Sequence, residues 1–174
     1  MATSTLNLPV AAAILPDGSS GNAAPGITRR QGTEGNPKKH FLTADFDAAT
    51  DEHIWYTFRV PANYISGGTV KLLWQANATT GTCRWGTRLA AITPADADTP
   101  LEHAEAAAST VGTATNVTEA RRLNESSIAI GALDSVVAGD LVYLVIYRDA
   151  DGTSGTDDLA VDAELIQAAF EYTS

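Results

Sequence analysis

The chain has 174 residues, of which 21 are acidic and 11 are basic, so its formal net charge is −10. This length is typical of one domain with a sizeable core, and stability needs no disulfide or metal to explain it. The negative charge argues against a nucleic-acid partner, because the phosphates would be repelled. The single cysteine, Cys83, excludes an internal disulfide and a cysteine-based zinc cluster.

The first forty residues differ in composition from the rest. They hold four prolines and five glycines, a density that disfavours a long helix or a central strand. They carry four basic and two acidic residues, whereas residues 41–174 carry seven and nineteen. Both a solvated tail and an extended arm that orders on a neighbouring subunit fit this segment, and its apolar stretches favour the arm. We expect the arm to bind its partner through Leu8, Val10, Ile14, Leu15, Arg29, Arg30, Lys38 and Lys39.

From residue 41 onward, apolar and polar residues alternate with period two, which is typical of half-buried strands. The alternation, together with a nearly continuous apolar run over residues 140–147, predicts seven strands, and residues 8–15 are a candidate eighth. A change of phase between Leu165 and Ile166 predicts a bulge. Residues 101–120 read as a long excursion with one short helix in its alanine-rich start. The strands are expected at 41–47, 53–60, 69–75, 83–91, 124–130, 140–147 and 159–172.

This pattern predicts an all-β chain. We expect a jelly-roll β-sandwich of about eight antiparallel strands over residues 41–174, preceded by an extended N-terminal arm over residues 1–40. No run approaches the roughly 18 apolar residues of a membrane span, so we expect no membrane partner. The apolar patch from Leu8 to Leu15 is short, interrupted by Pro9 and not preceded by basic residues, so we expect no classical leader.

The three tryptophans differ in whether they fall on the apolar or the polar side of their predicted strands. Trp74, Trp85 and Cys83 fall in the apolar phase of their strands, which predicts that they are core residues. Trp55 falls in the opposite phase to its apolar neighbours, so it is the candidate surface aromatic, of a kind that could stack on a sugar.

The segment from Asp149 to Asp158 carries closely spaced acidic residues and glycines. Asp149, Asp151, Asp157 and Asp158 are therefore candidate calcium ligands, because Ca²⁺ takes carboxylate oxygens from short loops. The segment lacks the closing glutamate of a regular calcium loop, and an exposed hairpin turn is the simpler interpretation. We expect Arg148 to form a weak surface ion pair with one of these carboxylates.

No motif for catalysis stands out. The three histidines, His40, His53 and His103, are isolated in sequence, and no nucleophile elbow, phosphate-binding loop or dinucleotide fingerprint occurs. The sequence therefore predicts no enzyme and no cofactor.

Several turn-forming motifs spread over the chain. They include Leu15-Pro-Asp-Gly-Ser-Ser-Gly-Asn-Ala-Ala, Trp55-Tyr-Thr-Phe-Arg-Val-Pro-Ala-Asn-Tyr, Trp85-Gly-Thr-Arg, Tyr147-Arg-Asp-Ala-Asp and Phe170-Glu-Tyr. Together they resemble a group of small jelly-roll virion proteins of tailed bacteriophages. In such virions the fold resembles capsid decoration (cement) proteins and fibre modules.

The resemblance implies a structural protein that decorates the outer capsid surface of the virion and is made in the host bacterial cytoplasm. Its expected partners are the major capsid protein and two further copies of itself, in a homotrimer, with the arm stabilising the head. The alternative is a receptor- or carbohydrate-binding module of a phage tail or fibre, which Trp55 and the loop from Asp149 to Asp158 motivate. A hydrolase or a host protein unrelated to phages fits the residues less well.

Overall fold

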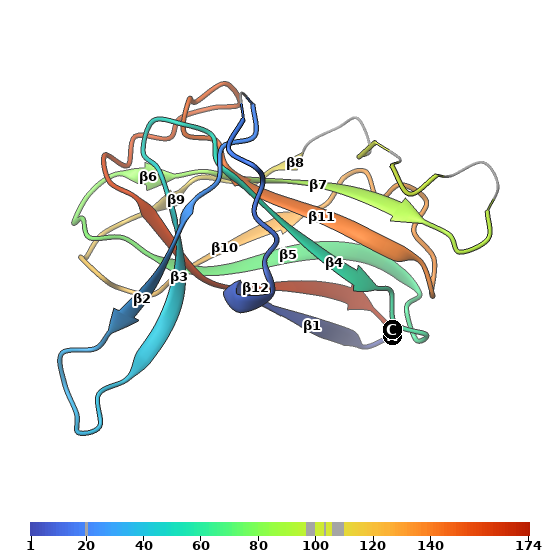
Figure 1. Ribbon diagram of the computed structural model, residues 1–174, viewed down its shortest axis with the longest axis horizontal. Helices are drawn as coiled ribbons and strands as arrows, with labels where there is room; N and C mark the ends of the chain where they lie inside the picture. Colours follow the sequence, from blue (N-terminus) through green and yellow to red (C-terminus); the bar gives the residue numbers. More distant parts are fainter. Residues whose placement is uncertain (20, 97–99, 103, 106–109) are drawn as a thin grey trace.

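The computed structural model describes residues 1–19, 21–96, 100–102, 104–105 and 110–174, and it shows two antiparallel sheets packed face to face (Figure 1). The larger sheet has the order β10 (Asn124–Ala129), β5 (Ser66–Gln75), β12 (Ala163–Thr173), β3 (His40–Phe46) and β2 (Gly26–Gln31), and β1 (Thr3–Pro9) also pairs with β12. The smaller sheet has the order β4 (His53–Arg59), β11 (Leu141–Arg148), β7 (Trp85–Ile92) and β8 (Thr110–Val111). A short ladder joins β6 (Thr82–Cys83) to β9 (Thr115–Asn116).

The predicted all-β sandwich is confirmed, as are all seven expected strands. The register of β12 against β5 shifts between Leu165 and Gln167, which confirms the predicted bulge. The expected short helix falls partly on residues 103 and 106–109, which lie outside the described residues. Within the described part of the chain, the only helical element is a 3₁₀ turn, η1 (Val10–Ala12), and no helix is long and apolar enough to cross a membrane.

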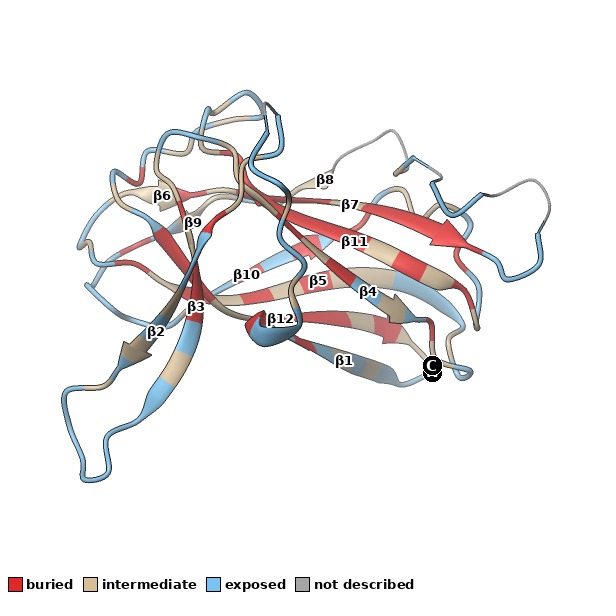
Figure 2. Ribbon diagram, in the orientation of Figure 1, coloured by how far each residue is buried: buried red, intermediate tan, exposed pale blue. Residues whose placement is uncertain are grey.

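The core lies between the facing sides of the two sheets, and β7 and β11 are buried along most of their length (Figure 2). Trp74, Trp85 and Cys83 are almost completely buried there, as predicted. The Trp85 ring meets the edge of Phe46 at 4.9 Å and lies 6.0 Å from the Trp74 ring. The indole N–H of Trp74 donates to the Ser126 hydroxyl at 2.9 Å, so this buried polar group is satisfied.

The first forty residues differ from the expected arm, because they fold onto their own chain. β1 pairs with β12 from Thr3 opposite Thr173 to Pro9 opposite Gln167, and β2 forms a hairpin with β3. The prolines and glycines do not prevent this, because they lie at strand ends, in the connection over residues 13–25 and in the loop of the β2–β3 hairpin. Leu8 is consequently only 5% exposed within the shared core.

Candidate binding groove

The edge of the smaller sheet carries a groove on its outer face. β4 is the last strand of this sheet, and its free side is partly covered by the segment that follows η1. There Ile14 and Trp55 form a single antiparallel bridge, in which each backbone N–H donates to the other residue's carbonyl, at 2.8 and 2.9 Å. The bridge places the N-terminal segment beside the Trp55 side chain.

The groove is a hollow of about 420 Å³ with both apolar and polar walls. Its lining residues are Ile14, Leu15, Pro16, Asp17, Asn22, Trp55 and Tyr143. Trp55 and Tyr143 are half-buried, and they occupy adjacent strands of one face, since Trp55 pairs with Val145 and Tyr143 lies two residues before it. Ile14 and Leu15 are 50% and 42% exposed, although both are apolar.

A row of stacked side chains supports Trp55 from within the same face. The His53 ring lies 6.0 Å from Trp55 and 5.4 Å from Tyr147, and the Arg88 guanidinium lies 5.5 Å from the centre of the Tyr147 ring. Gly86 makes room for this row, because a Cβ atom at that position would lie 2.1 Å from Tyr147 Cζ. Burial, followed by the nearby Arg88 charge, lowers the pKa of His53, so the ring is neutral at neutral pH.

The polar wall of the groove is a turn held by its own side chains. Asp17 Oδ1 accepts hydrogen bonds from the backbone N–H of Ser19 at 3.0 Å and from its hydroxyl at 2.7 Å, and Asn22 Nδ2 donates to Ser19 Oγ at 3.1 Å. The Ser19 hydroxyl is the main cause that lowers the pKa of Asp17, followed by the Ser19 backbone N–H. The groove therefore presents a carboxylate and an amide in fixed positions beside two aromatic rings.

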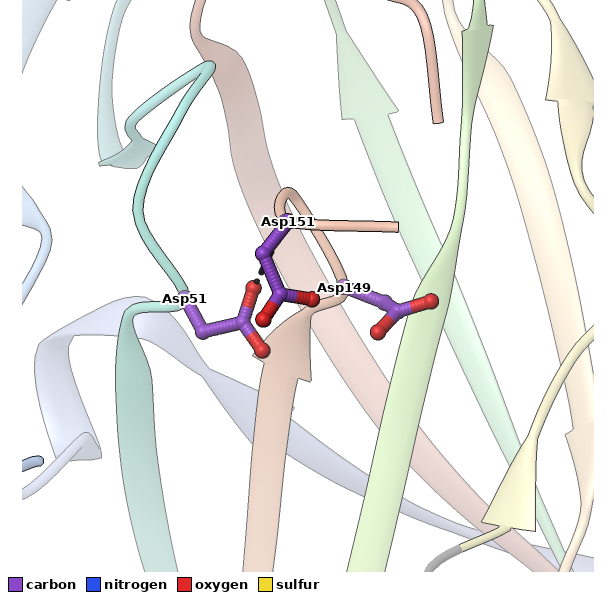
Figure 3. Close-up of side chains that lie close together, drawn as sticks. All are labelled: Asp51, Asp149 and Asp151. Carbon is purple, nitrogen blue, oxygen red and sulfur yellow. Dashed lines mark hydrogen bonds between the residues drawn. The ribbon is translucent and has the colours of Figure 1, made fainter. Parts of the chain in front are cut away.

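The four candidate calcium ligands do not lie together in the structure. Asp149 and Asp151 meet Asp51, and carboxylate oxygens of the three lie within 4.8 Å of one another (Figure 3). These carboxylates already accept hydrogen bonds. The Ser154 N–H donates to Asp149 at 3.2 Å within the loop, and the Asp151 N–H donates to Asp51, which precedes β4, at 3.1 Å. Carboxylate oxygens in this arrangement could hold Ca²⁺, and calcium binding stays a prediction. Asp51 is a further candidate ligand, which the sequence did not indicate.

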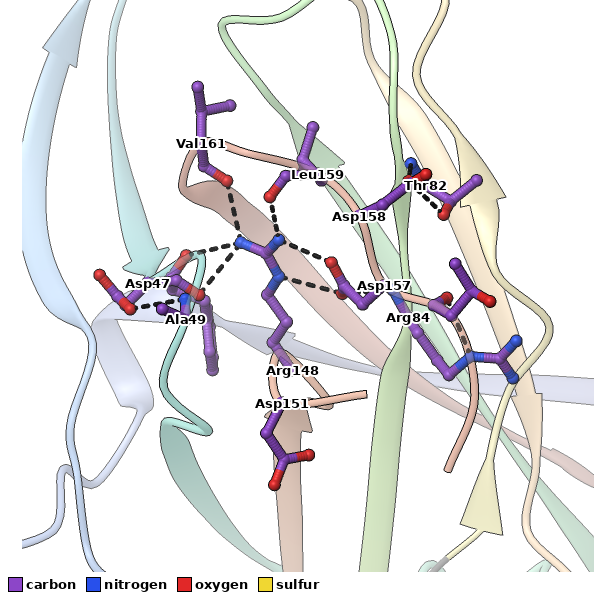
Figure 4. A network of polar contacts seen from close by, with 12 residues as sticks. Asp47, Ala49, Thr82, Arg84, Arg148, Asp151, Asp157, Asp158, Leu159 and Val161 are labelled. Atoms are coloured by element: carbon purple, nitrogen blue, oxygen red, sulfur yellow. Dashed lines mark hydrogen bonds and ion pairs between the residues drawn. The ribbon is translucent and has the colours of Figure 1, made fainter. Parts of the chain in front are cut away.

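Asp157 and Asp158 have other roles. Asp158 Oδ1 accepts from the Thr82 N–H at 2.6 Å and from its hydroxyl at 2.7 Å. Asp157 forms an ion pair with Arg148 at 2.7 Å, and both side chains are at most 1% exposed (Figure 4). The expectation of a weak surface pair for Arg148 was therefore wrong.

Arg148 links three parts of the chain. Its guanidinium also donates to the carbonyl oxygens of Phe46, Asp47, Leu159 and Val161. It points inward because it is the last residue of β11 and shares the core-facing phase of Leu144 and Ile146. Arg148 thus anchors the loop that carries Asp149 and Asp151.

The expected partner-binding residues do not form one surface. Leu8 and Val10 are buried in the core, whereas Ile14 and Leu15 line the groove. Arg29, Lys38 and Lys39 are exposed on the β2–β3 hairpin or its loop, and Arg30 forms ion pairs with Asp45 and Glu164.

Tyr143, Asp17 and Asn22 are groove residues that sequence reasoning missed. Tyr143 belongs to a strand that is apolar in both phases, so periodicity gives it no surface signal. Asp17 and Asn22 have the composition of any turn, and only the Ile14–Trp55 bridge brings that turn to the tryptophan.

No protein family model and no curated protein sequence matches this chain. Among solved structures, the CBM22-1–GH10 modules of xylanase 10B from Clostridium thermocellum, complexed with xylohexaose, are similar with a TM-score of 0.50 and 16% identity. The match covers 98% of this chain and 26% of that one, so the chain spans about a quarter of that structure.

Two other structures are more distant. TmCBM61 in complex with β-1,4-galactotriose gives a TM-score of 0.41 at 9% identity, over 99% of this chain and 88% of that one. The enzymatically active domain of tailspike protein 4 of bacteriophage CBA120 gives 0.39 at 8% identity, over 97% and 19%. At these identities the likeness concerns the fold alone, which is a jelly-roll β-sandwich of the kind found in carbohydrate-binding modules.

Proposed function

We propose that this protein is a carbohydrate-binding module that binds glycans in the groove lined by Trp55 and Tyr143. The observation that carries the proposal is a half-buried tryptophan, in tilted contact with the His53 ring, beside a tyrosine and a fixed polar turn. Sugar rings present an apolar C–H face and a rim of hydroxyl groups. An aromatic ring can cover the C–H face, while a carboxylate and an amide pair with the hydroxyls.

The fold is compatible with this function, since the structures of similar fold include the CBM22-1–GH10 modules of a xylanase, which were complexed with xylohexaose. Fold does not determine function, so the proposal rests on the groove itself. The residues that line the groove would determine which glycan binds. A receptor glycan that a phage tail or fibre recognises is one candidate.

Capsid decoration remains a prediction from the sequence resemblance. Two of the eight residues expected to hold the capsid, Leu8 and Val10, are buried in the protein's own core and support no such contact. The expected homotrimer, the virion location and the absence of enzymatic activity likewise remain predictions.

A glycan array tests the proposed function. The wild-type protein should bind a defined subset of glycans, and Trp55→Ala should lose that binding while it remains folded. Ile65→Ala is the matched control, because Ile65 is also an exposed apolar residue, 59% exposed, and does not line the groove. Absence of binding to all glycans, or equal binding by Trp55→Ala, would contradict the proposal.

A further inference from the structure

A second hollow lies on the opposite side of the sandwich, at the base of the β2–β3 hairpin. It has a volume of about 360 Å³, within the usual range for small-ligand sites, roughly 300–1,000 Å³. Its walls come from the hairpin and its loop, from the ends of β5 and β12, and from the loop before β10. The lining residues are Arg30, Gln31, Gly32, Thr33, Phe41, Gln75, Arg121 and Glu164.

The polar side chains of this hollow are held by one another. The Arg30 guanidinium bridges two carboxylates, Asp45 at 2.7 Å and Glu164 at 3.0 Å. Gln75 Nε2 donates to the other oxygen of Glu164 at 2.6 Å. The Asp45 and Glu164 side chains are only 12% and 10% exposed, whereas that of Arg30 is 36% exposed, so a well-supported guanidinium faces the hollow.

Arg121 adds a second guanidinium from a strained backbone. Its φ is +60°, a conformation that residues other than glycine rarely adopt, and its backbone N–H donates to the Ala76 carbonyl at 2.7 Å. Strain of this kind is held in place by surrounding structure and is frequent at functional sites. Phe41, which pairs with Arg30 across the hairpin, contributes a half-buried ring to the same wall.

The charges identify the class of ligand. Arg30 is neutralised by Asp45 and Glu164, and Asp162 adds a negative charge close to Arg30 and Asp45. The hollow therefore carries no net positive charge, which favours a neutral ligand over an anion. Guanidinium and amide groups donate hydrogen bonds and the carboxylate accepts them. Hydroxyl groups, which do both, match this mixture, and Phe41 can cover the apolar face of a sugar ring.

From this geometry we infer that the hollow is a second binding site, which takes one neutral pyranose unit. This inference rests on the proposed function only for the expectation that the ligand is a sugar, since the two sites share no residue. Binding at both sites would let one module hold two glycan chains, or two positions of a branched one, and so raise its avidity.

Side-chain amide resonances in ¹⁵N-resolved NMR spectra of the full chain test the inference. The probes are D-xylose, D-galactose, D-glucose and N-acetyl-D-glucosamine, each titrated to about 50 mM, so that millimolar affinities are detected. At least one sugar should shift the Gln31 and Gln75 amides, and the shift should persist in Trp55→Ala. Arg121→Ala should weaken it about tenfold, the expected loss of one charged hydrogen bond.

Arg122→Ala is the matched control, because Arg122 is adjacent, 58% exposed and paired with Glu119 outside the hollow. Equal weakening by both variants, or no shift of these amides with any sugar, would overturn the inference. A response confined to the Trp55 indole would overturn the second site while supporting the proposed function. A response confined to the Gln31 and Gln75 amides would support the second site and contradict the proposed function. A response to D-glucuronate but to no neutral sugar would overturn the assigned ligand class.

Discussion

At the scale of single residues, Arg148 has the largest expected effect on stability. Replacing it by lysine keeps the charge but cannot reproduce the paired bonds to Asp157 and the bonds to four carbonyl groups. We expect Arg148→Lys to lose about 2–4 kcal/mol of unfolding free energy, because lysine leaves some of these buried carbonyl oxygens without a donor, at about 1–3 kcal/mol each. Urea denaturation measures this, and exposed Arg29→Lys should change it by less than about 0.5 kcal/mol. A loss for Arg148→Lys no larger than that of the control would mean that the network does not stabilise the fold.

The residue scale also gives a pH prediction at Asp51. Burial is the main cause that raises the pKa of this carboxyl, and the neighbouring Asp151 and Asp149 charges add to it. The folded state therefore holds the proton more tightly than the unfolded state does, and stability falls as pH rises from the ordinary pKa of 3.8 through the raised pKa. In EDTA, Asp51→Asn should therefore raise the melting temperature at about pH 7. The gain in unfolding free energy should be less than about 1 kcal/mol, because the group is partly solvated.

That gain should shrink as the pH falls through the raised pKa of Asp51 toward 3.8, because the wild-type carboxyl then takes up its own proton. Thermal unfolding scans of both proteins across this pH range provide the check. A gain that is constant with pH would show that the carboxyl charge is not its cause.

At the scale of elements, the decisive feature is β1, because it makes the N-terminal segment part of the sandwich. Leu8 is 5% exposed, so Leu8→Ala should lose about 2–5 kcal/mol, as other buried leucines do. Leu15→Ala is the control, since Leu15 is 42% exposed and should change stability by less than about 0.5 kcal/mol. Equal, small effects in chemical denaturation would instead favour a free arm.

The pairing of β7 with β11 gives a second prediction at this scale. A methyl group at Gly86 would displace the Tyr147 ring and, through His53, disturb Trp55. Gly86→Ala should therefore lose about 1–3 kcal/mol of stability and also weaken glycan binding. Gly26→Ala is the control, because nothing lies within 4 Å of its added Cβ. Normal glycan affinity in a destabilised Gly86→Ala variant would show that the row of His53, Tyr147 and Arg88 does not support glycan binding in the groove.

The elements also show what the sequence could predict. Period-two alternation, and for residues 140–147 a continuous apolar run, located seven strands. The phase change at Leu165 located the bulge, because burial on one face leaves a direct mark on the sequence. β1 and β2 were missed because prolines and glycines near their ends obscured short alternating runs. Trp55 was identified by its phase, but its neighbours Asp17 and Asn22 depend on a long-range bridge that no local pattern records.

At the scale of the whole molecule, each sheet of the sandwich presents a hollow on its outer side, while the core between the sheets is closed and apolar. The first hollow is aromatic and the second is mainly polar. This arrangement suits a module that binds ligands on a rigid scaffold, since the groups that line each hollow are held by hydrogen bonds, ion pairs or stacking.

The central claim is that glycans stack on Trp55, and the indole N–H resonances of the three tryptophans test it most directly. Trp74 and Trp85 are buried, so their indole signals serve as internal controls within one spectrum. On titration with a glycan selected from the array, the Trp55 signal, identified by its absence in Trp55→Ala, should shift in a saturable manner while the other two stay fixed. Saturable glycan binding that leaves the Trp55 signal unmoved would contradict the account.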